Sequence, residues 1–285
     1  MEKIIKEKIS SLLSEEEEVL SVEQLGGMTN QNYLVKTTNK QYIVKFFGKG
    51  TEKLINRQDE KYNLELLKDL SLDVKNYLFD IESGIKVNEY IDSATTLDST
   101  SIKTKFEKIA PILQTIHASG KELRGEFAPF EEIKKYESLI EGNIPYANYE
   151  VVRKEVFLLE KRLADLCVDR KSCHIDLVPE NFIESPQGRL YLIDWEYSSM
   201  NDPMWDLAAL FLESDFTNQE EEDFLAYYES DKTPVSREKI RIYKILQDTI
   251  WSLWTVYKEA QGADFGDYGV SRYQRAVEGL TYYGG

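Results

Sequence analysis

One stretch constrains this chain more than any other, the run Cys173 to Asn181 with Asp194 a short way behind it. Asp176 stands five positions before Asn181, and Asp194 follows an apolar run, Leu190 to Ile193. Aspartate, asparagine and aspartate in this order are typical of phosphoryl transfer, where the first is a base and the other two hold magnesium. A single Asp or Asn in a loop more often caps the backbone, but the ordered set favours chemistry.

The neighbouring residues predict how this set comes together. A Pro-Gln-Gly turn, residues 186–188, joins two short apolar segments into a hairpin, which brings Asn181 and Asp194 to one edge near Asp176. Magnesium takes carboxylate and amide oxygens together with nucleotide phosphate oxygens. We therefore expect Asp176 to deprotonate an acceptor hydroxyl while Asn181 and Asp194 hold Mg²⁺ against ATP.

Near the start of the chain, two period-two segments flank a glycine turn. Backbone N–H groups at such a turn can approach a phosphate, although a Gly-Gly hairpin without a ligand is commoner. The predicted ATP-covering residues of this segment are Gly26, Gly27, Met28, Thr29, Asn30 and Asn32.

Next, Lys45 stands in the middle of a strongly β-forming run, residues 41–47. A lysine on a buried strand requires an anion, whereas a lysine on an edge strand faces water. A helix predicted over residues 53–70 supplies Glu60 as a candidate partner. Hairpin, strand with Lys, then helix with Glu is the order of a kinase N-terminal lobe, so we expect Lys45 to bind nucleotide phosphates with Glu60 beside it.

Two more strands, residues 77–81 and 85–91, complete an expected five-stranded antiparallel sheet, and from Ser101 the pattern is mostly helical. The sequence therefore predicts an α+β, bilobal, protein-kinase-like fold with a small N-lobe (1–91) and a larger, mainly helical C-lobe (92–285). In such an architecture the connection between the lobes holds the adenine, and this connection begins with Asn88, Glu89, Tyr90 and Ile91.

The segment after Asp194 indicates a small acceptor. A helix with an Asp202 cap and Pro203 in its first turn is predicted within ten residues of Asp194. This leaves no room for the long activation segment of a protein kinase.

The composition narrows the classes of partner that the chain can bind. The net charge of −16, from 51 acidic and 35 basic residues, argues against nucleic acid and suits a cationic small substrate, or simply solubility. No secretory signal and no apolar run of roughly 20 residues is visible, and two cysteines fit a reducing cytosol, so we expect a cytoplasmic protein without membrane insertion. Cys173 and His117 are expected to be core residues, and a zinc site has little support. Oligomeric state is not indicated.

Two segments, H-I-D-L-V-P-E-N and I-D-W-E-Y-S-S-M-N-D-P-M-W-D-L-A, resemble the choline/ethanolamine kinase family of the aminoglycoside-phosphotransferase superfamily, and the resemblance covers essentially the full length. It implies transfer of the ATP γ-phosphoryl group to choline, giving phosphocholine for bacterial surface polymers. His174 joins Asp176 in the matching catalytic loop. Trp195-Glu196 replaces the Phe-Gly of protein kinases, so regulation by loop flipping is not implied.

The resemblance also implies a choline pocket. Trp251 and Trp254 are three apart and therefore share a helix face. A quaternary ammonium has no N–H to donate and is recognised by aromatic faces and nearby carboxylates. The implied choline-side residues are Asp176, Asp194, Glu196, Tyr197, Glu213, Trp251, Trp254, Tyr268 and Arg272, with Glu196 alternatively pairing with a basic side chain or shaping the metal site.

Two alternatives remain open. Another small-molecule kinase, acting on ethanolamine, an aminoglycoside or a sugar, would share every ATP-side residue. A pseudokinase that senses nucleotide or choline without turnover is the second, although Lys45, Asp176, Asn181 and Asp194 are all intact.

Overall fold

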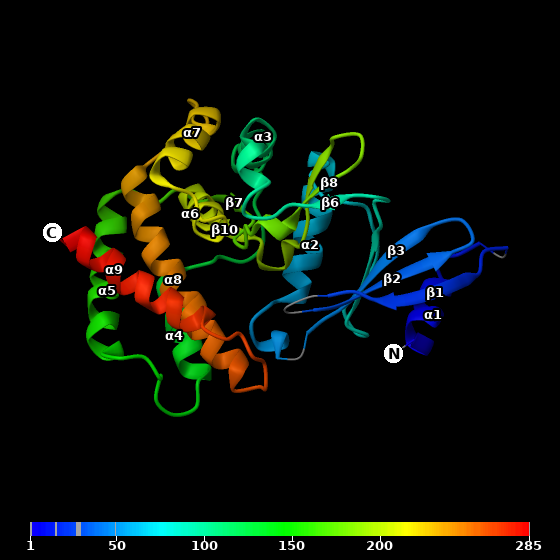
Figure 1. Ribbon diagram of the computed structural model, residues 1–285, viewed down its shortest axis with the longest axis horizontal. Helices are drawn as coiled ribbons and strands as arrows, with labels where there is room; N and C mark the ends of the chain where they lie inside the picture. Colours follow the sequence, from blue (N-terminus) through cyan, green and yellow to red (C-terminus); the bar gives the residue numbers. More distant parts are fainter. Residues whose placement is uncertain (1, 15, 27–29, 49, 285) are drawn as a thin grey trace. The chain divides into compact units, whose positions relative to one another are not determined.

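In the computed structural model, which describes residues 2–14, 16–26, 30–48 and 50–284, the period-two segments form a five-stranded antiparallel sheet. Its strands stand in the order β1-β2-β3-β5-β4 (Figure 1). Their bounds are β1 Val19–Gln24, β2 Gln31–Thr37, β3 Gln41–Phe46, β4 Asn76–Asp80 and β5 Ile85–Glu89. The expected sheet is confirmed, and β3 is its central strand.

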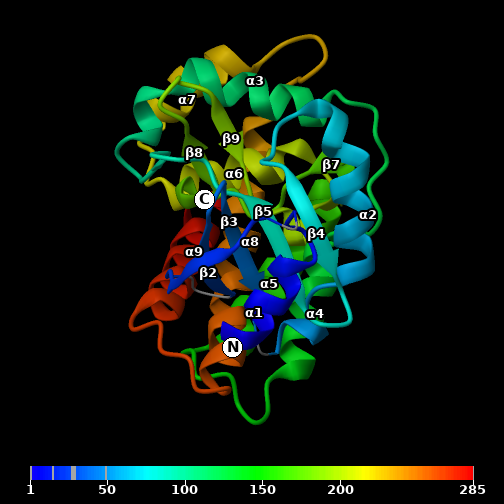
Figure 2. The ribbon, with the colours of Figure 1, turned by 90° about the vertical axis from the view of Figure 1, so that its right-hand side faces the viewer.

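The two faces of this sheet carry different residues. Tyr33, Val44 and Val87 are opposite one another in the register and belong to an apolar cluster with Ile5 and Ile9 of α1 (Glu2–Ser10). Side chains alternate along a strand, so the neighbouring positions point to the other face. Figure 2 shows α1 lying across the strands and α2 beside β4.

α2 (Arg57–Leu67) faces the polar side of the sheet, because Glu60 contacts Lys86 of β5. Its first turn is capped by Asn56, whose side-chain oxygen accepts the N–H groups of Gln58 and Asp59. Short 3₁₀ turns flank it: Lys68–Leu70 lies within the predicted range, whereas Thr51–Lys53 begins two residues before it. α1 ends at Ser10, and the chain enters the sheet at Val19.

The hairpin around Asp194 joins the same part of the molecule. β8 (Phe182–Glu184) pairs with β9 (Leu190–Leu192) and with the short β6 (Thr95–Thr96), which the sequence did not predict. One compact unit accordingly comprises Met1–Leu97 together with Glu180–Glu196. A single boundary at residue 91 does not describe this unit, because the chain returns to it.

The second unit comprises Asp98–Pro179 and Tyr197–Gly285 and is mainly helical. α6 is buried along most of its length, and it begins as predicted with an Asp202 cap and Pro203 in the first turn. The helices are α3 Phe106–His117, α4 Pro129–Leu139, α5 Tyr149–Asp165, α6 Pro203–Glu213, α7 Asn218–Tyr228, α8 Arg237–Glu259 and α9 Tyr268–Gly284, with a two-stranded pair of β7 Lys171–Cys173 and β10 Ser199–Asn201.

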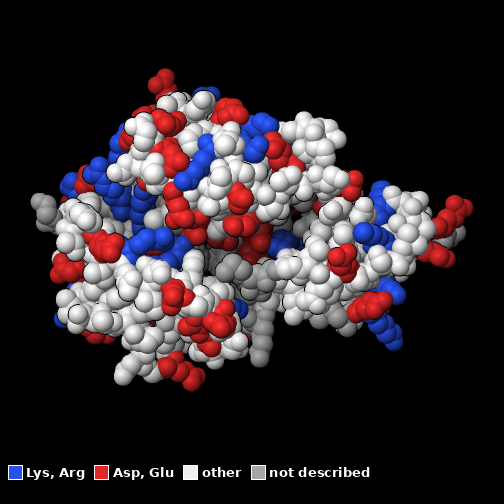
Figure 3. Space-filling model, viewed as in Figure 1, with Lys and Arg blue, Asp and Glu red and all other residues white. Residues whose placement is uncertain are grey.

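Among the helices that the structure describes, none combines the length and the apolar character that a membrane span requires. On the face drawn in Figure 3, carboxylates and cations are interspersed rather than separated.

Candidate active site

Hydrogen bonds to residues of α6 hold the loop that carries Asp176. Ile175, the residue before Asp176, has φ +77°, which is rare for a β-branched side chain. Its N–H donates to Asp206 Oδ1 (2.8 Å), its carbonyl accepts the Trp205 indole N–H (3.0 Å), and the N–H of His174 donates to Asp206 Oδ2 (2.8 Å). These bonds stabilise a strained backbone next to the predicted base.

His117 completes this anchor. Its Nε2 lies 3.0 Å from Asp206 Oδ2 and its Nδ1 lies 2.7 Å from the Tyr228 hydroxyl. A carboxylate only accepts, so Nε2 carries the proton and Nδ1 accepts from Tyr228. The prediction of a satisfied core histidine is confirmed.

Cys173 lies close to this anchor without being a nucleophile. His117, Cys173 and Asp206 could by distance hold a metal ion, but the carboxylate and both imidazole nitrogens already have partners. The Cys173 thiol is fully buried, and burial, then the Asp206 charge, raises its pKa. The prediction that Cys173 is a packing residue is confirmed.

Removing the anchor is expected to damage both stability and rate. Asp206→Ala leaves two backbone N–H groups and His117 without their acceptor, so we expect a loss of about 3 kcal/mol in the free energy of unfolding. The rate should fall about a hundredfold, because the loop that carries Asp176 loses its position. Urea unfolding and steady-state kinetics measure both effects. Asp231→Ala, at an exposed turn, is the control; equal behaviour of the two variants would contradict the role of Asp206.

His174 lies two residues before the predicted base. Its side chain is fully buried, whereas Asp176 is partly exposed. The backbone N–H of His174 donates to Asp206, so this residue takes part in positioning the loop. The catalytic role expected for His174 stays a prediction.

Several aromatic residues of the second unit contact one another. Tyr197 packs edge-on against Trp251 at 5.8 Å between ring centroids, and Phe127 lies 6.4 Å from the same tryptophan. Burial is the main cause that raises the pKa of Tyr268, and the charge of Asp176 is the next cause. Among the predicted aromatic residues, Tyr268 is therefore the one within reach of the charge of the predicted base.

Of two further aromatic residues of this region, one had no signal in the sequence and the other had one. Phe127 stands in the connection before α4, where no periodicity marks it. Phe265 lies 4.9 Å from the Trp254 ring, and its place in the aromatic run before Tyr268 was the available signal.

Glu213 and Arg272 form an ion pair. Arg272 is 1% exposed, its Nη2 contacts Glu213, and its Nη1 lies 2.9 Å from Asp248 Oδ1. Its guanidinium also covers the Tyr268 ring at 4.9 Å. Arg272 thus links α6, α8 and α9, and the choline-side roles expected for Arg272 and Glu213 stay predictions.

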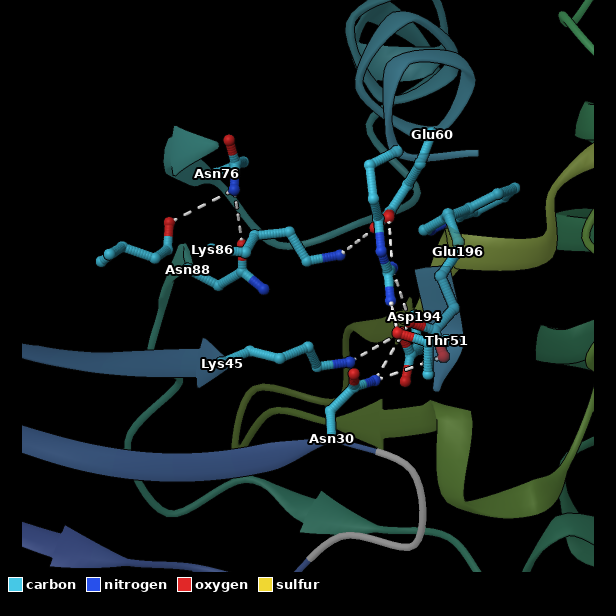
Figure 4. A network of polar contacts seen from close by, with 12 residues as sticks. Asn30, Lys45, Thr51, Glu60, Asn76, Lys86, Asn88, Asp194 and Glu196 are labelled. Atoms are coloured by element: carbon cyan, nitrogen blue, oxygen red, sulfur yellow. Dashed lines mark hydrogen bonds and ion pairs between the residues drawn. The ribbon is translucent and has the colours of Figure 1, made fainter. Parts of the chain in front are cut away.

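In the first unit, Lys45 pairs with Asp194. The Nζ to Oδ1 distance is 2.6 Å, and Lys45 is 8% exposed (Figure 4). Asp194 has φ +66°, a conformation in which Asp and Asn are enriched among non-glycine residues. The backbone therefore holds this carboxylate at the end of β9, beside the predicted phosphate-binding lysine.

Glu60 is not the partner of Lys45, which corrects the expectation from chain order. Its Oε1 lies 2.7 Å from Lys86 Nζ and its Oε2 lies 2.6 Å from Arg57 Nη1. Both oxygens of the α2 carboxylate are occupied by these two cations.

Glu196 is a buried ion-pair residue. Arg57 Nη1 lies 2.9 Å from its Oε2, and Asn30 Nδ2 donates to both carboxylate oxygens at 3.0 and 3.2 Å. Burial, and then the nearby Asp194 charge, raise the pKa of Glu196, while Lys45 and Arg57 oppose the shift. Of the three roles expected for Glu196, pairing with a basic side chain is confirmed, and choline contact and shaping of the metal site stay predictions.

The remaining ATP-side residues have varied surroundings. Gly27, Met28 and Thr29 lie outside the described residues. Asn32 Nδ2 donates to the Gly26 carbonyl at 3.1 Å, and Asn88 of β5 accepts from Asn76 at 2.8 Å. Glu89 ends β5, before Tyr90 and Ile91, so the expected adenine contact of this segment stays a prediction.

The donor set for a metal fits a hard cation. Asn181 is 7% exposed, and its carbonyl accepts the N–H of Ile193 at 2.8 Å, which ties it to the residue before Asp194. An amide oxygen and a carboxylate so tied are donors that suit Mg²⁺ rather than zinc.

Comparison with known proteins agrees with this arrangement. The model of the choline/ethanolamine kinase family matches residues 22–242. The chain belongs to that family. The matched residues include both the strand that carries Lys45 and the loop that carries Asp176, so the choline/ethanolamine kinase assignment covers the predicted phosphate-binding lysine and the predicted base.

Members of the choline/ethanolamine kinase family give close matches. A crystal structure of choline kinase LicA from Streptococcus pneumoniae is 88% identical, with a TM-score of 0.96 and 99% of each chain covered. A structure of LicA in complex with AMP is 89% identical, with a TM-score of 0.93, covering 99% of this chain and 98% of the other. Protein LicA of Haemophilus influenzae is 29% identical and covers 89% of this chain and 78% of that protein. The predicted protein-kinase-like fold and the predicted family are confirmed, and the chain is an ATP-dependent kinase.

Proposed function

We propose that this chain is a choline kinase that transfers the γ-phosphoryl group of ATP to the hydroxyl of choline, giving phosphocholine and ADP. The observation that carries the proposal is the 88% identity, over 99% of the chain, to a protein described as choline kinase LicA. The aromatic residues of the second unit support the same substrate, because a quaternary ammonium is recognised by aromatic faces.

On the ATP side, Lys45 would bind the phosphates and residues 26–30 would cover them. Asn88 to Ile91 would hold the adenine. Asn181 and Asp194 would hold Mg²⁺, which neutralises charge on the phosphates when bound. The ion pair of Lys45 with Asp194 holds these two side chains against each other.

On the acceptor side, residues 92–285 supply the base and the choline pocket. Asp176 accepts the proton of the choline hydroxyl while the hydroxyl oxygen of choline bonds to the γ-phosphorus. At the same time the bond between that phosphorus and the leaving ADP breaks. Trp251, Trp254, Tyr268 and Tyr197 would surround the trimethylammonium group, and Glu213, paired with Arg272, lies on the adjoining helix.

A substrate panel in a coupled ADP-release assay tests the proposal. Choline should give the highest kcat/KM, above ethanolamine, an aminoglycoside and a sugar. Preference for another acceptor would contradict choline as substrate, and binding without turnover would support the pseudokinase alternative.

Removing one aromatic face should affect choline more than ethanolamine. For Trp254→Leu we expect kcat/KM for choline to fall about tenfold and for ethanolamine less than threefold, because ethanolamine keeps N–H groups that can bind carboxylates or water. Trp254→Phe, which keeps an aromatic face, is the matched control. Equal losses for both substrates in Trp254→Leu would show that this ring does not select the quaternary ammonium.

The cellular setting is part of the same proposal. A cytoplasmic location and the use of phosphocholine for bacterial surface polymers follow from the family resemblance and remain predictions.

A further inference from the structure

Two lysines stand directly opposite one another on the polar face of the sheet. Lys45 of β3 is in register with Lys86 of β5, and Lys86 is only 3% exposed. Like charges directly opposite destabilise a sheet, and a buried ammonium requires an anion. Each lysine therefore requires a counter-ion.

The two counter-ions come from different elements. Lys45 takes Asp194, whereas Lys86 takes Glu60 of α2 at 2.7 Å (Figure 4). The Glu60 side chain has no exposed surface, so this pair is shielded from water. The acid of α2 is thus committed to the lysine that lies one strand further along the sheet.

Arg57 extends this pair toward the metal ligand. Its Nη1 lies 2.6 Å from Glu60 Oε2 and 2.9 Å from Glu196 Oε2. Its Nη2 donates to Thr51 Oγ1 at 3.0 Å, and its guanidinium carbon lies 3.9 Å from the centroid of the Phe47 ring. A planar guanidinium with these four contacts has little freedom to move. Lys86, Glu60, Arg57 and Glu196 therefore form one continuous, rigid chain of ion pairs.

We propose that Lys86 is a positioning residue for phosphoryl transfer: it holds Glu60 and, through Arg57 and Glu196, fixes the backbone that presents Asp194. Lys45 is thereby left to bind phosphate, so anchoring of α2 and binding of nucleotide belong to two different lysines. This inference rests on the proposed function for the roles of Lys45 and Asp194.

The test compares Lys86→Met, Lys86→Arg and Lys45→Met, with Lys36→Met, an exposed lysine of β2, as the matched control. For Lys86→Met, kcat/KM for ATP should fall roughly tenfold to a hundredfold, because a small displacement of Asp194 is costly. KM for choline should stay within about twofold, since the aromatic residues lie in the second unit. Lys86→Arg should recover most of the loss, as the positive charge on Glu60 is kept, and Lys45→Met should cost about a hundredfold.

Three results would overturn the inference. Lys86→Met with a lowered melting temperature but unchanged kcat/KM for ATP at 20 °C would make Lys86 purely structural. A mild Lys45→Met beside an inactive Lys86→Met would make Lys86 the phosphate-binding lysine. If the wild-type chain does not phosphorylate choline, the proposed function fails, but calorimetry with ATP still tests Lys86. We then expect ATP to bind about fivefold more weakly to Lys86→Met than to the wild type. Unchanged ATP binding would overturn the positioning role of Lys86.

Discussion

Asp176→Asn is expected to lower kcat for choline phosphorylation by about 10³-fold, within the range for loss of a positioned general base. Asparagine has almost the same shape but cannot take the hydroxyl proton. The strained backbone at Ile175 is bound to Asp206 and Trp205 and should stay in place. A coupled ADP-release assay at saturating ATP and choline measures kcat.

The control for this variant is Asp165→Asn, at the exposed end of α5, which should keep wild-type kinetics. Calorimetry with ATP should give similar affinities for Asp176→Asn and wild type, because the ATP-side residues are untouched. A kcat within tenfold of wild type would remove Asp176 from the role of base.

Asp194→Asn is expected to cost about 10³-fold in kcat/KM for ATP and to raise the Mg²⁺ concentration needed for half-maximal rate. An amide oxygen is a weaker ligand than a carboxylate, and roughly 4 kcal/mol of transition-state stabilisation corresponds to this factor. Asparagine tolerates the positive φ of this position, so backbone strain does not add to the effect. An ATP titration at saturating Mg²⁺ gives the first value, and a Mg²⁺ titration at fixed ATP gives the second.

Asp194→Asn also leaves Lys45 without its counter-ion, and a second variant separates this effect. In Lys45→Met/Asp194→Asn the stranded cation is gone. Activity of the double variant equal to that of Lys45→Met alone would trace the loss to the cation and contradict a metal-ligand role, whereas a further large loss below Lys45→Met would support it.

Features with a local cause were predictable from the sequence. Alternation around Lys45 marked β3, the Asp202-Pro203 pair marked the start of α6, and the spacing of Asp176, Asn181 and Asp194 marked the chemistry. Each of these depends on residues within a few positions, so a single sequence contains the signal.

Pairings set by distant parts of the chain were not predictable. Glu60 was paired with Lys45 because the two follow one another in the chain, but the register of β3 with β5 brings Lys86 to the same face. Arg57 contacts Glu196, 139 positions away, which no local pattern reveals. The anchoring role of Asp206 was not predictable either, because it depends on hydrogen bonds between α6 and the distant Asp176 loop.

The return of residues 180–196 to the first unit has a consequence for biosynthesis. When translation has reached Leu97, all five strands of the first sheet and Lys45 have been synthesised, but Asn181 and Asp194 have not. At that stage β6 still lacks its partner β8. In topological terms, residues 98–179 are an insertion within the first unit. The buried charges of Lys45 and Arg57 can therefore be neutralised by Asp194 and Glu196 only after about two-thirds of the chain has been translated, which makes completion of this unit a late event in synthesis.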